Sequence, residues 1–146
     1  MALRAADSSR RVGNAREHTF AGENVIVTAP DQDDGKEVRV QKDDVVTTPE
    51  MLTQSDFKPR RMVMNLILDK DHAGSDRPVI KPAVTIRIKV TDEDDRNAGG
   101  RDKVKAAYWY QGKWIVFGEK HGFRIDGGFA QATLAVWGDP AIAFGP

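Results

Sequence analysis

The chain has 146 residues, 30% of them charged, and its 22 basic and 22 acidic side chains cancel to a formal net charge of zero. This balance argues against a nucleic-acid-binding protein, because such proteins normally carry a basic excess. No apolar run reaches the ~18 residues that predict a membrane-spanning helix. The chain contains no cysteine, which excludes disulfides, a thiolate nucleophile and a zinc–thiolate site.

The N-terminal segment differs in character from the rest of the chain. Residues 1–22 are polar and show no clear hydrophobic period, so we expect a flexible or peripheral arm there. Residues 23–146 are expected to form one domain. Within it, runs that are β-branched or alternate between apolar and polar residues predict about eight strands. These runs lie at residues 24–29, 36–41, 61–69, 83–91, 104–110, 113–117, 123–126 and 129–137.

Helical signals are sparse in this sequence. Thr47 or Thr48 can cap a helix that starts at Pro49, and only one short turn can follow before Pro59. The charged segment 92–102 is interpreted as a loop. Short strands separated by turns, with at most one short helix, are typical of an all-β fold, an antiparallel β-sandwich that is immunoglobulin-like in the broad sense.

The segment 104–117 is predicted to form a central β-hairpin. Its two aromatic-rich runs flank Gln111-Gly112, a two-residue turn that suits the twist of a hairpin because glycine tolerates positive φ. This turn would pair Trp109 with Trp114 on one face and place Tyr108 on the other. Both faces are largely apolar, which indicates a hairpin covered on both sides or a hairpin with one exposed aromatic face.

The order of these features resembles that of ZU5-like β-sandwich modules of bacterial surface and multidomain proteins. The matching segments are KEVRVQ, MVMNLILD, KPAVTIRIKV, TDEDDRNAGGRD and AYWYQGKWIVFG. Some ZU5-like domains carry a His-Phe-Ser self-cleavage motif, but here His121-Gly122-Phe123 is not followed by serine. The resemblance therefore implies a non-catalytic scaffold or interaction module, in the cell envelope or outside the cell, although the N-terminus does not read as a signal peptide.

The residues offer few catalytic or metal-binding patterns. The three histidines, His18, His72 and His121, show no paired spacing and are predicted to be solvated loop residues. No serine lies in a G-x-S-x-G motif, so we assign no catalytic residue. Acidic clusters occur near residues 31–34, 69–76 and 92–95. Calcium prefers oxygen ligands from such loops, and no other cofactor is indicated. The best candidate ligands for Ca²⁺ are Asp69, Asp71 and Asp76.

Three functions remain open from the sequence. The leading one is a non-enzymatic structural or protein-interaction module of a bacterial envelope or multidomain protein, with a protein partner or self-association. The second is a carbohydrate-binding module, in which the hairpin aromatics stack on sugar rings. Its candidate ligand-binding residues are Trp109, Trp114, Tyr108 and Tyr110. The third is a small hydrolase with two acidic catalytic residues in a cleft. No binding to nucleic acid and no insertion into membranes is expected.

Overall fold

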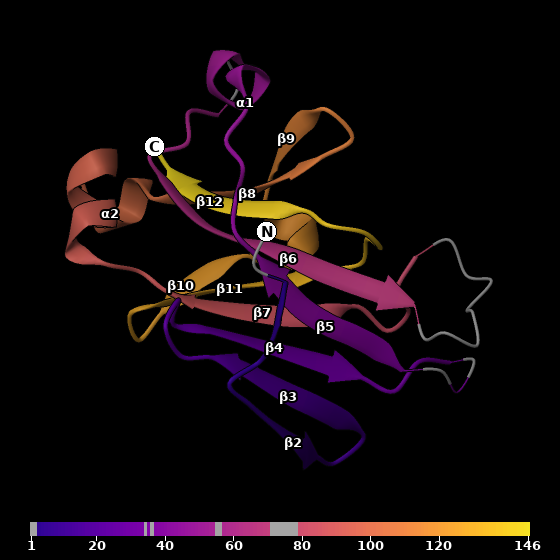
Figure 1. Cartoon of the computed structure of the whole chain (residues 1–146). Coiled ribbons are helices and arrows are strands. Elements are labelled where there is room, and N and C mark those ends of the chain that lie inside the picture. Colours follow the sequence, from indigo (N-terminus) through magenta and orange to yellow (C-terminus); the bar gives the residue numbers. More distant parts are fainter. Residues whose placement is uncertain (1–2, 34, 36, 55–56, 71–78) are drawn as a thin grey trace.

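Two six-stranded antiparallel sheets pack face to face in the computed structural model, which describes residues 3–33, 35, 37–54, 57–70 and 79–146 (Figure 1). Sheet A contains, in spatial order, β1 (Arg4–Ala5), β5 (Val38–Asp43), β6 (Arg61–Lys70), β12 (Ala141–Gly145), β8 (Lys105–Tyr110) and β9 (Lys113–Val116). Sheet B contains β10 (Arg124–Asp126), β11 (Phe129–Leu134), β7 (Val84–Lys89), β4 (Val25–Pro30), β3 (Ala15–Phe20) and β2 (Ser8–Val12). The predicted antiparallel sandwich is thus confirmed at the level of two packed sheets.

The alternation of the sequence explains how the core forms. In β7, buried Val84, Ile86 and Ile88 alternate with more exposed residues, so one face of the strand points into the sandwich. β4 and β11 show the same pattern of burial. Side chains from β5, β6, β8 and β12 meet them from sheet A and complete the core between the sheets.

The central hairpin has the predicted register. Trp109 pairs with Trp114 across β8 and β9, and Gln111 and Gly112 both have positive φ, as the expected turn requires. Tyr108 points into the main core, whereas Trp114 belongs to a second apolar cluster on the outer face of sheet A. That cluster is covered by helix α1 (Pro49–Thr53) and the segment after it. The alternative of a hairpin covered on both sides is therefore the one observed.

The number of strands and helices differs from the prediction. The described residues form twelve strands instead of about eight, and three of the additional strands lie in the segment expected to be a peripheral arm. The loop expected at 92–102 contains helix α2 (Asp92–Ala98), followed by the short 3-10 helix η1 (Arg101–Lys103); a second one, η2, spans Glu119–His121. None of the helices among the described residues is both long and apolar enough to cross a bilayer.

Helix α2 is held in position mainly by polar contacts, because its sequence has no apolar face that could pack on the core. Thr91 accepts a hydrogen bond from the backbone of Asp94, whose carboxylate accepts one from the backbone of Thr91, and Gly99 ends the helix with a positive φ. The buried Asp94 also accepts two hydrogen bonds of 2.8 Å from Arg61 on β6. Burial acts to raise the pKa of Asp94, but these hydrogen bonds and the charge of Arg61 outweigh it and lower the pKa.

Candidate functional site

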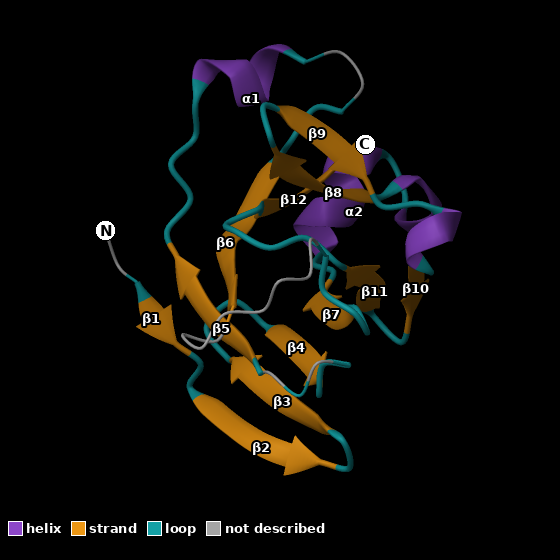
Figure 2. Ribbon diagram, turned by 90° about the vertical axis from the view of Figure 1, so that its right-hand side faces the viewer, coloured by secondary structure: helices purple, strands orange, loops and turns teal. Residues whose placement is uncertain are grey.

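Sheet A is incomplete along one side of the sandwich. Its outermost strand, β1, has two residues and pairs with β5 only at Gln41 and Lys42. The rest of β5, from Val38 to Val40, pairs with β6 and, among the described residues, has no strand on its other side. Figure 2 shows the short β1 beside β5, with β3 and β2 on the facing sheet.

The facing strands of sheet B turn polar side chains toward this incomplete side. His18 on β3 lies directly opposite Val27, which lies opposite Ile86, and both of these residues are buried in the core. Directly opposed residues in an antiparallel pair share a face, so His18 also points inward. Ser9 on β2 is paired with His18, and Arg16 lies two residues before it on the same face of β3. The inner face therefore changes from apolar on β7 and β4 to polar on β3 and β2.

A groove of about 430 Å³ occupies this side of the sandwich. Ligand pockets in proteins commonly measure roughly 300–1,000 Å³, so the groove has room for a few side chains of a ligand. It is lined by residues from five strands and their ends: Ala5, Ala6, Ser9, Arg11, Arg16, His18, Ala29, Pro30, Asp31, Glu37, Val38, Arg39, Val40 and Gln41. The five consecutive lining residues 37–41 show that the groove runs along the edge of β5.

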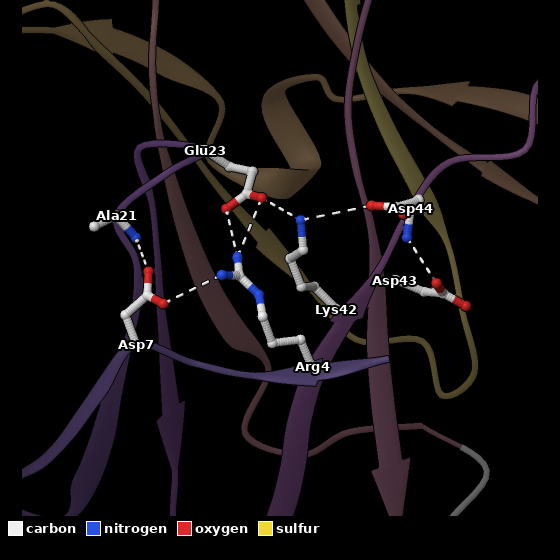
Figure 3. Close-up of polar contacts among 7 residues, drawn as sticks. All are labelled: Arg4, Asp7, Ala21, Glu23, Lys42, Asp43 and Asp44. Atoms are coloured by element: carbon white, nitrogen blue, oxygen red, sulfur yellow. Dashed lines mark hydrogen bonds and ion pairs between the residues drawn. The ribbon is translucent and has the colours of Figure 1, made fainter. Parts of the chain in front are cut away.

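A cluster of charged side chains holds β1 at one end of the groove (Figure 3). Arg4 contacts Glu23 at 3.2 Å and Asp7 at 3.3 Å, and Lys42 on β5 forms an ion pair with the same Glu23. Asp7 also accepts a hydrogen bond of 2.8 Å from the backbone of Ala21. These contacts attach β1 to the β3–β4 connection, and the chain then leaves sheet A to begin β2. The cluster thus fixes β1 where the chain leaves sheet A, and no strand of the described residues pairs with β5 beyond that point.

His18 is the most unusual polar group in the groove. Its side chain is only 8% exposed, and its Nδ1 lies 2.9 Å from the hydroxyl of Ser9. Its Nε2 is buried and has no hydrogen-bond partner among the described residues. Burial lowers the pKa of His18, the positive charge of Arg16 lowers it further, and Glu37 opposes both effects. The ring is therefore neutral near pH 7 and carries one unsatisfied nitrogen, which is costly in a buried setting.

The prediction that the histidines are solvated loop residues is wrong for His18. The prediction failed because the residues around His18 are mostly polar, so the sequence of β3 shows no alternation of apolar and polar residues that would indicate a strand. His121 is half-buried in η2, where its Nδ1 accepts a hydrogen bond from the backbone of Gly118, and its ring contacts Phe117 edge to face. His72 lies outside the described residues.

The charges of the groove are partly paired with each other. Arg11 forms a two-pronged ion pair with Asp31, and this hydrogen bond holds the pKa of Asp31 below its usual range. The guanidinium of Arg16 makes no hydrogen bond or salt bridge with any described residue, but its charge acts on His18 and Asp31. Three arginines and two carboxylates line the groove, which leaves one net positive charge when His18 is neutral.

The four aromatic residues predicted to bind a ligand do not form one exposed surface. Tyr108 and Trp114 are each 6% exposed, and Trp114 donates a 2.7 Å hydrogen bond to the backbone of Met51. Trp109 is half-buried on the outer face of sheet A and packs edge to face on Trp114 at 5.3 Å. Tyr110 is half-buried against the main core. The hairpin therefore uses these rings mainly for packing.

The predicted calcium ligands fall largely outside the described residues. Asp69 is an exposed residue of β6, whereas Asp71 and Asp76 are in the segment 71–78, which is not described. The acidic cluster at 92–95 forms the first turn of α2, and Asp94 and Asp95 there are paired with arginines. No group of three or more potential metal ligands occurs within the described part of the chain.

Sequence reasoning missed the residues that form the groove, above all Ser9, Arg16 and His18. One signal was present: Gly13-Asn14, with Gly13 at a φ of +60°, is a typical hairpin dipeptide between β2 and β3. Comparisons of the chain with protein-family models, with curated proteins and with solved structures found no match. The geometry of the groove is therefore the main evidence for function.

Proposed function

We propose that this chain is a protein-interaction module that accepts an extended segment of a partner protein as an added strand beside β5. The observation that carries the proposal is the edge of Val38–Val40, which no strand of the described residues covers. This edge lines a groove of about 430 Å³, while β1 pairs only with Gln41 and Lys42. The setting that we propose is the one implied by the ZU5-like resemblance, a bacterial envelope or multidomain protein.

The backbone of β5 provides the first part of the argument. Alternate residues of a strand direct their backbone N–H and C=O groups to the same edge. The backbone groups of β5 that are not directed toward β6 therefore present hydrogen-bond donors and acceptors to the groove. An unpaired strand edge is a template for another extended chain. A bound segment that continues the line of β1 would satisfy these groups, which is the basis of affinity in β-strand addition.

The facing sheet provides the second part. An added strand would lie over the inner face of β3 and β2, which carries His18, Arg16 and Ser9. Its side chains would alternate between the groove and the outer face of sheet A. The groove would thus determine which inward-pointing side chains of the partner can bind. Binding would also extend sheet A beyond the edge of β5, over β3 and β2.

The other two functions receive less support from the geometry. A carbohydrate platform needs accessible ring faces, whereas Trp114 and Tyr108 are buried. A hydrolase needs a carboxylic acid with a raised pKa beside a carboxylate. Asp31 and Glu37 both line the groove, but the ion pair with Arg11 lowers the pKa of Asp31. Ser9 and His18 form a hydroxyl–imidazole pair, yet no described carboxylate orients the ring through Nε2, as a catalytic triad requires.

A selection from a random dodecapeptide library displayed on phage tests the proposal. The bait is the full chain, and each enriched peptide is then measured against two matched variants of β2. In Ser9→Trp the indole fills the groove, whereas in Ser8→Trp it points from the opposite face of the same edge strand. Both positions are exposed, so both variants are expected to fold, and circular dichroism checks this.

The expected result is a set of peptides that bind the wild type and Ser8→Trp but not Ser9→Trp. In the wild-type protein, the peptides should slow hydrogen exchange at backbone amides in 38–40, because an added strand protects them. The proposal is overturned if no peptide is enriched, or if the enriched peptides bind Ser9→Trp equally well and protect amides elsewhere. The exchange measurement needs no variant, so it decides the question even if Ser9→Trp fails to fold.

A further inference from the structure

The inward face of β3 presents two polar groups whose partners are missing from the described chain. One is the buried Nε2 of His18, and the other is the guanidinium of Arg16, which lies two residues away on the same face. A side chain that is more than nine-tenths buried rarely leaves a polar atom unpaired, because the lost hydration is not compensated. The unpaired Nε2 of His18 therefore indicates a group that enters the groove from outside the described residues, beside the half-buried Arg16.

The hydrogen bond to Ser9 determines what kind of group this is. Ser9 is exposed, so its hydroxyl can rotate and donate to Nδ1 of His18, which places the single proton of the neutral ring on Nε2. In this arrangement Nε2 is a buried, unpaired donor on a residue that lines the groove. Arg16 offers only donors. Both groups therefore require an acceptor, and a positively charged, planar guanidinium favours a carboxylate with two oxygens.

The balance of charge in the groove supports the same choice. Arg11 and Asp31 satisfy each other, so an incoming anion meets the positive charge of Arg16 on the inner face of β3. An incoming lysine or arginine side chain would instead be repelled by Arg16 and would find no acceptor at Nε2. An apolar side chain would leave both donors buried and unsatisfied, which disfavours binding.

Resting on the proposed strand addition, we infer that the bound segment carries an aspartate or glutamate whose carboxylate accepts hydrogen bonds from Nε2 of His18 and from Arg16. The carboxylate sits on an inward-facing position of the added strand, between β5 and β3. Its neighbours in the peptide at alternate positions also face the groove, next to Ala29 and the inner side of β5. The partner is thus an extended segment with one acidic anchor.

The peptides enriched in the selection described above test this inference. Each acidic residue of a bound peptide is replaced in turn by its amide, and binding is measured for the wild type, for Arg16→Gln and for Arg10→Gln. Arg10 is the matched control, because it lies on the outer face of β2 and pairs there with Glu17. Replacing the anchor should weaken binding to the wild type and to Arg10→Gln by about tenfold or more, as expected for a charge-assisted hydrogen bond.

The double-mutant cycle gives the decisive result. With Arg16→Gln, the acidic peptide and its amide version should bind almost equally, because the charged partner of the carboxylate is lost and an amide oxygen can still accept the hydrogen bond from Nε2 of His18. The inference is refuted if the enriched peptides carry no acidic residue in common, or if the amide replacement weakens binding to Arg16→Gln as much as to the wild type. In either case, loss of binding to Ser9→Trp would still support strand addition. If no peptide is enriched at all, the proposed function and this inference fail together.

Discussion

Replacing His18 with leucine is expected to stabilise the protein in the absence of any partner. The buried, unpaired Nε2 costs about 1–3 kcal/mol, and a leucine would remove this cost and add apolar contact with the neighbouring Val27. The substitution also loses the hydrogen bond with Ser9, worth about 0.5–1.5 kcal/mol, but the exposed hydroxyl regains water. The net gain should be about 1 kcal/mol in the free energy of unfolding.

Urea unfolding followed by tryptophan fluorescence measures this change directly. A gain of this size in a chain of 146 residues should raise Tm by roughly 2–4 °C. Ser9→Ala is the matched control with the opposite sign, because it removes the partner of Nδ1 and leaves both ring nitrogens without a hydrogen bond. A loss of stability of about 1 kcal/mol or more in His18→Leu would refute the reasoning, since it would mean that Nε2 is satisfied in the native protein.

The same variant should change how stability depends on pH. Burial and the charge of Arg16 lower the pKa of His18, so the unfolded chain binds more protons than the native state between that lowered pKa and about 6.5. Stability is therefore complete above about pH 6.5 and falls as the pH drops toward the native pKa. His18→Leu should lose less stability between about pH 8 and pH 5. Part of the slope remains, because burial also lowers the pKa of His121.

Four further substitutions test packing in other parts of the two sheets. Trp114→Ala should lower the free energy of unfolding, measured in urea, by about 3–5 kcal/mol. The substitution leaves a cavity in the apolar cluster under α1 and removes a buried hydrogen bond. Asp94→Asn should cost about 3 kcal/mol by leaving its arginine partner unpaired, whereas Asp95→Asn, in an exposed ion pair, should hardly move the urea midpoint. Gly145→Ala should lower Tm, because its new methyl group would collide with the carbonyl oxygen of Lys58; an unchanged Tm would contradict that close packing.

The hairpin of β8 and β9 could be predicted because its sequence indicates the position of the turn and hence the pairing of the strands, although it left open which face is buried. Gln111-Gly112 fixes the loop, and the pairing of Trp109 with Trp114 follows from a loop of two residues. The alternating apolar residues of β7 and the β-branched run of β4 were equally informative. In each of these strands, the buried face is apolar, so the sequence pattern and the tertiary structure agree.

The elements that escaped prediction have buried faces that are polar. Helix α2 has the sequence DEDDRNA and buries Asp94, so it lacks an apolar period, although Thr91 and Asp94 have the spacing of a capping box. Strand β3 turns Arg16 and His18 inward and only Phe20 fills the core in the usual way. Hydrophobic periodicity cannot detect an element that is held by hydrogen bonds and ion pairs, because its inward residues look like those of a loop.

This failure of the hydrophobic pattern is itself an argument for binding at the groove. Inward-facing polar residues on β3 and β2 weaken the free protein, since burial penalises charges and unpaired nitrogens. At the 92–95 segment the corresponding cost is offset within the chain, because Asp94 meets Arg61. At the groove, the buried Nε2 of His18 has no such compensation among the described residues. Unpaired hydrogen-bond donors beside an accessible strand edge suit the recognition of an extended acidic segment. A domain that served only as a scaffold would be more stable with leucine at position 18.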